Sequence, residues 1–209
     1  MAETLVDLQT WPRAAQFAWF KTYDRPHYAT TTRLDVTRLM DLRKGQGVSP
    51  YRACLYAIGA GLHAAPELLM RFRGDTVVQH DSLRLSMPVP TPSGSFNYAY
   101  VPFAADFAQF DVAAAEVITR TAAAADLNAN EGASDDLAFL SCMPWLDYTS
   151  INNALSGPED CIPRVTWGKI VHDAGKWRMA MTLEVHHALV DGAQVGAYFA
   201  ATQAALDQV

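Results

Sequence analysis

The chain has 209 residues, half of them hydrophobic, and carries a formal net charge of −6 and three cysteines. This length fits one domain over residues 1–209 that can bury a full core. The acidic balance argues against a nucleic-acid partner, which requires a basic face, and three irregularly spaced cysteines fit neither a disulfide framework nor a zinc site. Residues 1–7 lack the basic and apolar pattern of a signal peptide, so we expect none, and no stretch reaches the roughly 18 apolar residues that could span a membrane. We therefore expect a cytoplasmic protein without a membrane partner.

Strand-forming and helical segments follow one another in the first third of the chain. Residues 28–36 are rich in β-branched residues and predict a strand. Thr37 is placed to cap a short helix over residues 37–44. Ser49, followed by a proline, predicts the start of a longer helix that ends before Pro66.

The rest of the chain predicts a mixture of strands and helices. Residues 75–103 indicate short strands separated by turns, and residues 88–94 have the composition of a loop inside one domain. Asp111 is predicted to cap a helix through Ala125, before a polar loop over residues 128–136. Further strands are predicted at 137–142, 147–151, 164–171 and 177–185, and a helix at 193–201. Strands and helices that do not alternate strictly indicate α+β or mixed α/β layers.

A seven-residue segment near the C-terminus carries the strongest chemical signal. It reads His186-His187-Ala188-Leu189-Val190-Asp191-Gly192 and lies between the last predicted strand and the last predicted helix. Catalytic residues concentrate on loops that a rigid scaffold positions. Histidine is the side chain best suited to transfer protons near neutral pH. The segment is therefore a candidate catalytic site.

The histidine pair alone leaves three interpretations open. In the first, the pair is structural, with Asp191 as the cap of the last helix. In the second, Glu184, the histidines and Asp191 bind a metal ion. Neighbouring strand residues point to opposite faces, however, which disfavours a shared ion, and we expect no metal. In the third, one histidine acts as a general base.

Four segments together resemble the chloramphenicol acetyltransferase family, and they come in the family's order. The motif His-His-x-x-x-Asp-Gly at residues 186–192 is its main mark. Residues 141–150 resemble the family's Ser-x-x-Pro-Trp run with a serine further on, residues 10–20 its Trp-x-Arg start with aromatics, and residues 163–169 its Pro-x-x-Thr-x-x-Lys strand. The resemblance spans nearly the whole chain and favours the general-base interpretation.

The resemblance implies both a fold and a mechanism. The fold would be α/β, a mixed α+β two-layer sandwich whose mixed sheet is covered by helices on one side. His187 would take the proton from a chloramphenicol hydroxyl as that oxygen attacks the thioester of acetyl-coenzyme A, the co-substrate. Ser150 would donate a hydrogen bond to the oxyanion, with Thr166 in support, and Asp191 would pair with Arg13. The second ring nitrogen of His187 would bond to that residue's own carbonyl.

The resemblance also implies an acceptor pocket and an oligomer. Family members bind the hydroxyl acceptor between aromatic side chains, and they are homotrimers with active sites at the subunit interfaces. The candidates for the pocket here are Trp19, Phe20, Tyr28, Phe96 and Tyr98.

Three residues near the candidate pocket depart from the family pattern. Phe20 stands where the family often has a tyrosine, and Pro26 and His27 replace small or thiol residues. These departures keep a different hydroxyl acceptor open as the alternative to chloramphenicol. A domain that takes its acyl group from a lipoyl arm, and a binding protein that keeps the fold without catalysis, are further alternatives.

Overall fold

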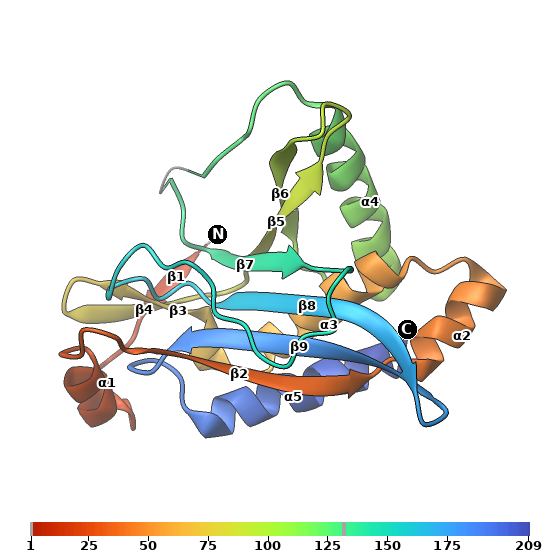
Figure 1. The fold of residues 1–209 in the computed structure, drawn as a ribbon. Coiled ribbons are helices and arrows are strands. Elements are labelled where there is room, and N and C mark those ends of the chain that lie inside the picture. Colours follow the sequence, from red (N-terminus) through yellow and green to blue (C-terminus); the bar gives the residue numbers. More distant parts are fainter. Residues whose placement is uncertain (1, 131–132) are drawn as a thin grey trace.

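The computed structural model describes residues 2–130 and 133–209, and its central feature is a six-stranded mixed sheet (Figure 1). Neighbouring strands are antiparallel, except that β7 runs parallel to both β5 and β8. A tight turn joins β8 to β9, and its residues Ala174 and Gly175 both have positive φ, at 48° and 81°, as the tightest hairpin turns require. In spatial order the strands are β2 (His27–Asp35), β9 (Lys176–His186), β8 (Arg164–Asp173), β7 (Leu137–Cys142), β5 (Arg84–Pro90) and β6 (Phe96–Pro102).

A small antiparallel sheet lies beside the large one. It contains β1 (Glu3–Leu5), β4 (Thr76–His80) and β3 (Met70–Arg73), with β4 in the middle. The short 3-10 helix η1 (Pro66–Leu69) leads directly into β3. This sheet ties the N-terminal segment to the chain that follows the long helix α3.

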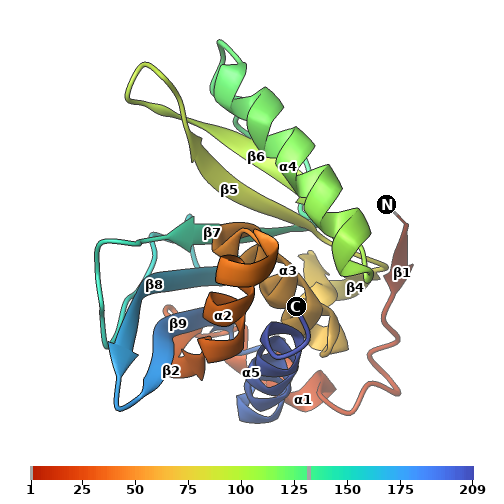
Figure 2. The ribbon, with the colours of Figure 1, turned by 90° about the vertical axis from the view of Figure 1, so that its right-hand side faces the viewer.

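Helices cover one side of the large sheet (Figure 2). Helix α3 (Pro50–His63) and helix α5 (Gly192–Leu206) pack against each other there, because Gly61 leaves room for Thr202 and Tyr198. A Cβ at position 61 would lie 2.1 Å from the Thr202 hydroxyl oxygen. Helix α4 (Phe107–Ala123) packs on β6, α2 (Thr37–Gln46) lies beside α3, and α1 (Ala14–Phe20) precedes β2.

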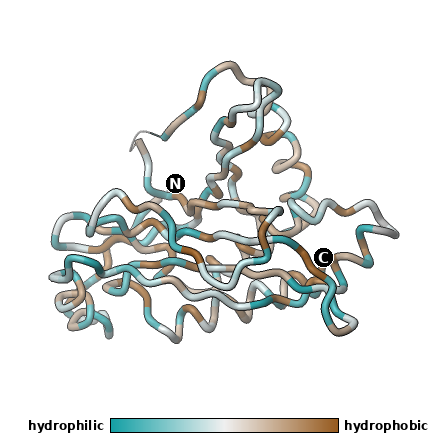
Figure 3. The backbone as a smooth tube through the Cα atoms, in the orientation of Figure 1, coloured by the Kyte–Doolittle hydropathy of each residue, from teal (hydrophilic) through white to brown (hydrophobic). Residues whose placement is uncertain are grey.

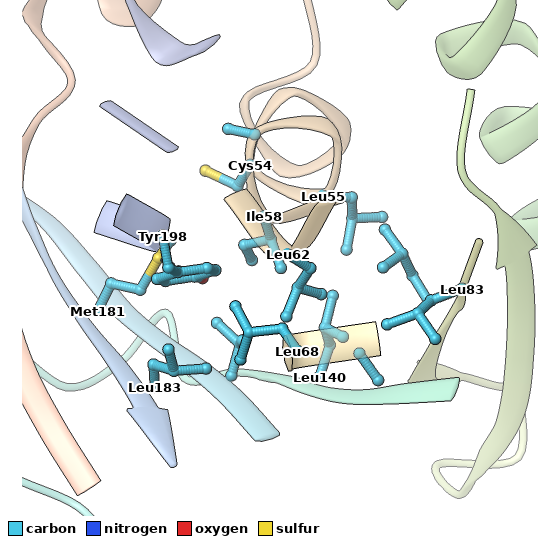
Figure 4. Packing of buried hydrophobic residues seen from close by; sticks show 14 of the residues in the cluster. Cys54, Leu55, Ile58, Leu62, Leu68, Leu83, Leu140, Met181, Leu183 and Tyr198 are labelled. Carbon is cyan, nitrogen blue, oxygen red and sulfur yellow. Dashed lines mark hydrogen bonds between the residues drawn. The ribbon is translucent and has the colours of Figure 1, made fainter. Parts of the chain in front are cut away.

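The main core lies between the sheet and these helices (Figure 4). Leu55, Ile58 and Leu62 recur at helical spacing on α3 and are fully buried. Met181, Leu183 and Val185 of β9 meet them from the sheet. We call this side of the sheet the helix face. The intervening residues Thr182 and Glu184 point to the opposite side, which we call the loop face.

Residues 143–163 form a long loop that crosses the loop face and that we call the serine loop (Figure 1). The strand predicted at 147–151 is wrong, because this segment belongs to the loop. Both edges of β8 are already paired, with β7 and with β9. The segment therefore lies across the sheet instead of joining it.

Two predicted helix caps are also wrong. Val36 is the cap position of α2, and the Thr37 hydroxyl instead accepts a hydrogen bond from the Trp177 amide at 2.9 Å. Helix α4 is capped by Asp106, whereas Asp111 lies within the helix and pairs with Arg52 at 2.6 Å. The caps predicted at Ser49 and Asp191 are confirmed. The predicted mixed sheet with helices on one side is confirmed as well.

In Figure 3, hydrophobic segments are short and are interrupted by hydrophilic ones. Among residues 2–130 and 133–209, no helix has both the length and the apolar character needed to cross a bilayer.

Candidate active site

The histidine pair lies where β9 ends and the chain turns into α5. His186 is the last residue of β9, and the His187 amide donates to the Pro26 carbonyl at 2.8 Å. Asp191 ends the turn, since its carboxylate accepts from the Ala193 amide at 3.0 Å. In return, the Gln194 side chain accepts from the Asp191 amide at 3.1 Å. This reciprocal cap fixes where the helix begins.

Arg13 fixes the backbone of the same turn. Its buried guanidinium donates to the Leu189 carbonyl at 3.0 Å and to the His187 carbonyl at 3.2 Å, and its third contact is the carboxylate of Asp191. Burial works to raise the pKa of Asp191, but the Ala193 amide and Arg13 outweigh it, and the pKa is lowered from its ordinary value. The ion pair that the resemblance implies is therefore present, with an ionised carboxylate.

Aromatic rings hold the His187 side chain, which makes no hydrogen bond to any described residue. The Phe20 ring stacks on the imidazole with centroids 3.9 Å apart and planes 8° apart, and the Tyr28 ring lies 4.7 Å away. Nδ1 is buried and has no hydrogen-bond partner in the described parts of the chain. The expected bond from this ring to its own carbonyl is therefore wrong, and the structure gives that carbonyl a bond from Arg13.

His186 has a different environment from its neighbour. Its Nδ1 accepts from the Ala188 amide at 3.1 Å, so the proton lies on Nε2, which donates to the Pro158 carbonyl at 2.9 Å. Burial lowers its pKa from 6.5 to about 4, although the bond to Pro158 acts in the opposite direction. Because both nitrogens are engaged, His186 cannot accept a proton from a substrate.

Nothing in the described residues favours the metal interpretation. They contain no group of three or more histidine, cysteine, aspartate or glutamate side chains placed to hold an ion. Glu184 bonds to Asn153, and Asp191 bonds to Arg13.

Ser150 and Thr166 belong to a second group of polar residues, on the loop face. Ser150 is exposed on the serine loop, whereas Thr166 of β8 is fully buried. The Thr166 hydroxyl donates to the Asn153 side chain at 3.2 Å, and its carbonyl accepts from the Tyr148 hydroxyl at 2.6 Å. Thr166 thus contacts the loop that carries Ser150.

The two groups lie on opposite sides of the sheet. Tyr28, which contacts His187, pairs with Val185 and packs against the core on the helix face. Thr166 pairs with Thr182, whose side chain is on the loop face. No hydrogen bond joins His187 to Ser150 in the residues that the structure describes. A single chain therefore presents the two candidate catalytic groups separately.

The predicted acceptor-binding residues also divide into two sets. Trp19 is 60% exposed, and its ring lies 4.9 Å from that of Phe20, so it borders the His187 group. Phe96 lines a cavity of about 780 Å³ with Ile118 and Trp145.

Tyr98 lines a different cavity, of about 390 Å³, together with Phe139, Asn153 and Arg164. His187 does not line either of these two cavities. The structure therefore brings Trp19, Phe20 and Tyr28 to the histidine, but not Phe96 and Tyr98.

Three residues that link the serine loop to the sheet were not assigned a role from the sequence. The sequence offers Glu184 only as a possible metal ligand, and it gives Tyr148 no role beyond a place in the segment 141–150. Asn153 gave no signal at all, since an asparagine in a loop has many ordinary roles.

Comparison with known proteins connects this geometry to a family. The family model described as chloramphenicol acetyltransferase matches residues 1–203. A chloramphenicol acetyltransferase of Bacillus pumilus is 27% identical over 188 residues, which cover 89% of this chain and 86% of that protein. Chloramphenicol acetyltransferase 3 of Escherichia coli is 22% identical over 200 residues, covering 95% of this chain and 94% of the relative.

Solved structures show the same fold at low identity. A chloramphenicol acetyltransferase superposes with a TM-score of 0.92 at 24% identity, covering 98% of this chain and 100% of that one. The dihydrolipoamide acetyltransferase of Azotobacter vinelandii follows with a TM-score of 0.67 at 16% identity, covering 93% and 86%. The family match over almost the whole length decides the assignment: this chain belongs to the chloramphenicol acetyltransferase family, enzymes that transfer an acetyl group from acetyl-coenzyme A to chloramphenicol.

Proposed function

We propose that residues 1–209 form a single chloramphenicol acetyltransferase-like domain that acetylates a hydroxyl of chloramphenicol, with His187 as the general base. The observation that carries this proposal is the arrangement around His187. Arg13 fixes the turn at three points, and Phe20 stacks on the ring. A general base needs such a fixed position, because proton transfer depends on geometry before pKa.

The chemistry is one addition followed by one elimination. Nε2 of His187 takes the proton of the acceptor hydroxyl while its oxygen attacks the thioester carbonyl of acetyl-coenzyme A. The tetrahedral intermediate carries its negative charge on the former carbonyl oxygen, to which Ser150 donates a hydrogen bond. Collapse breaks the carbon–sulfur bond, and the coenzyme A thiolate leaves and takes the proton back from His187. The products are the acetyl ester and free coenzyme A. No acyl-enzyme forms, because both substrates are held together.

We propose that the complete site forms between subunits of a homotrimer. His187 and Ser150 lie on different sides of the sheet in one protomer, which supports a site in which one subunit supplies the histidine and its neighbour the serine. On the serine side, the cavity lined by Tyr98 and Phe139 borders the loop that carries Ser150. We expect the acceptor to lie there and to meet Trp19, Phe20 and Tyr28 of the other subunit, with Phe96 at the edge.

The remaining roles follow from the same arrangement. Asp191 and Arg13 keep the backbone of His187 in place, and Thr166 supports Ser150 through Asn153. Since acetyl-coenzyme A is made and used inside cells, we propose that the enzyme acts in the cytoplasm.

A related acyltransferase with another hydroxyl acceptor is the second candidate. The observation that favours it is Phe20, which stacks on the base but has no hydroxyl to offer the acceptor, in a position where the family often has tyrosine. Pro26 and His27, in the adjacent segment, are further departures. None of these three departures removes a group that the proposed proton transfer at His187 requires.

Release of coenzyme A thiol tests the proposal. Wild-type protein with acetyl-coenzyme A and chloramphenicol should release thiol well above the rate without acceptor, and His187→Ala should abolish the difference. His172→Ala is the matched control, because His172 is exposed on the β8–β9 hairpin and should leave the rate unchanged. Thiol release with another alcohol and none with chloramphenicol would establish the second candidate. Equal turnover in the wild type and His187→Ala would refute the general base.

A further inference from the structure

The serine loop is fixed to the sheet on both sides of Ser150. Before the serine, the Met143 amide donates to the Trp167 carbonyl and the Leu146 carbonyl accepts from Lys169, each at 2.8 Å. The loop lies so close to β8 that a Cβ on Gly168 would be 2.6 Å from the Leu146 carbonyl oxygen. This first anchor is therefore made by the backbone.

Tyr148 extends this anchor to within two residues of the serine. Its hydroxyl donates to the Thr166 carbonyl at 2.6 Å and accepts from the Thr182 hydroxyl at 3.3 Å. Thr182 is in turn bonded to Thr31 at 2.7 Å, across two neighbouring strands. The segment that precedes Ser150 is thus connected by hydrogen bonds to three strands of the sheet, β8, β9 and β2.

After the serine, the anchor nearest to it is made by a buried carboxylate. Glu184 of β9 is only 4% exposed. One of its oxygens accepts from the backbone amide of Asn153 at 2.8 Å and from the side-chain amide of the same residue at 2.9 Å. The side-chain oxygen of Asn153 accepts from Thr166 at 3.2 Å.

This second anchor controls the path of the main chain. A buried carboxylate is costly unless it is well hydrogen-bonded, and bonds to a charged acceptor are among the stronger ones. One of the two bonds goes to a backbone N–H only three residues beyond Ser150. Ser150 itself is exposed and makes no hydrogen bond in the described residues, so the position of its hydroxyl depends on the two anchors.

We infer that Glu184 is a positioning residue for Ser150, acting through Asn153. The inference rests on the proposed function, since it takes Ser150 as the donor to the oxyanion. It also gives Thr166 an indirect role, because its hydroxyl holds the side chain of Asn153. Loss of the Glu184 anchor loosens the loop at Asn153, three residues beyond Ser150, while His186 still holds Pro158 further along the loop. The loosening moves the donor away from the oxygen on which charge develops.

A double-mutant cycle on kcat tests this inference. Ser150→Ala should lower kcat by about 10²- to 10³-fold, and Glu184→Ala by about 10- to 100-fold through displacement of the donor. If Glu184 acts through the serine, adding Glu184→Ala to Ser150→Ala should lower kcat by less than about threefold more. Glu184→Gln keeps an acceptor oxygen and should restore most of the activity that Glu184→Ala loses.

Asp136→Asn is the matched control for general damage to the fold. Asp136 is also a buried carboxylate, but it is held by Arg84 at 2.6 Å and lies outside the serine loop. Asp136→Asn should change kcat by the same factor in the wild-type protein and in the Ser150→Ala variant. Should Glu184→Ala fail to fold, Asn153→Ala removes the side-chain half of the anchor and enters the same cycle, with the melting temperature recorded for each variant.

Two results would overturn the inference. One is wild-type kcat in folded Glu184→Ala, and the other is an equal loss on Glu184→Ala with and without the serine hydroxyl. Wild-type protein that releases no thiol with any acceptor would instead overturn the proposed function, and this inference with it.

Discussion

Two adjacent histidines have opposite environments in this protein, although a sequence presents them as a pair. His186 uses both ring nitrogens in hydrogen bonds and is kept neutral by burial. The ring of His187 is held instead by Phe20 and Tyr28. Such aromatic contacts contribute about 0.5–1.5 kcal/mol each, and they leave Nε2 available to a substrate. His186 therefore has a structural role, and the proposed catalytic role belongs to His187.

The lowered pKa of His186 predicts a loss of stability in mild acid. The unfolded chain binds a proton near pH 6.5, whereas the folded chain binds it only near pH 4. The contribution of neutral His186 is therefore fully present above pH 6.5 and is lost as the pH falls toward 4, by up to about 3 kcal/mol. The free energy of unfolding, measured in urea at several pH values across this range, should fall with falling pH. His186→Gln should make this pH dependence weaker.

The control for this prediction is His172→Gln, at an exposed position, which should keep the slope of the wild type. The slope should decrease in His186→Gln without vanishing, because burial also lowers the pKa of His63. An unchanged slope in His186→Gln would show that His186 is not the group that titrates.

At the scale of elements, the turn that carries His187 is positioned by a helix that is distant in the sequence. Arg13 lies at the start of α1 and contacts His187, Leu189 and Asp191 in the turn between β9 and α5. These partners are separated from it by 174 to 178 positions in the sequence. Asp191 contributes to two elements at once, since it caps α5 and pairs with Arg13. The position of His187 therefore depends on the packing of α1 against the end of β9.

Asp191→Asn separates these two contributions, because asparagine is as good a helix cap as aspartate. The substitution should leave α5 intact but deprive the buried guanidinium of Arg13 of its negative partner. We expect a melting temperature lower by a few degrees, on the order of 1 kcal/mol, together with reduced kcat. Thermal unfolding and thiol release measure the two effects.

Asp173→Asn serves as its control, since Asp173 is exposed and its carboxylate lies 3.9 Å from Arg178. An exposed ion pair of this kind contributes little to stability, so the melting temperature and the rate of thiol release should stay at the wild-type values. Full activity and an unchanged melting temperature in Asp191→Asn would refute the positioning role of the ion pair.

At the scale of the molecule, the separation of His187 from Ser150 leads to a prediction about the assembly. Two variants, His187→Ala and Ser150→Ala, should each be inactive or nearly so. Co-expressed with different tags, they should form mixed trimers, in each of which one site of the three combines an intact histidine from one subunit with an intact serine from the next. Thiol release by the purified mixed trimers should therefore recover well above either parent.

The control is a mixture of the two purified variants without subunit exchange. Its rate of thiol release should equal only the sum of the rates of the two parent variants. Mixed trimers that are no more active than this sum would place both groups of a site in the same protomer.

Much of the site chemistry could be read from local sequence. The strand before His186, the caps at Ser49 and Asp191, and the order of the four motif segments all depend on residues near one another in the chain. Local signals failed where two candidates competed, as with Asp106 and Asp111, or where a strand-like segment had no free partner, as at 147–151. Propensity describes what a segment can form, and the pairing already made by β8 decided what it did form.

The sequence by itself determined which residue types are available for catalysis and the family to which they belong. Only the tertiary structure decided that the carbonyl of His187 accepts from Arg13, that Phe20 stacks on the His187 ring, and that Glu184 bonds to the serine loop. These contacts join segments that are distant in the sequence, and their geometry follows from how helices and strands pack. The separation of His187 from Ser150 has the same origin. Tyr28, beside the histidine, and Thr166, beneath the serine loop, lie on opposite faces of the sheet, because successive side chains of a strand alternate and only the folded sheet gives each face its neighbours.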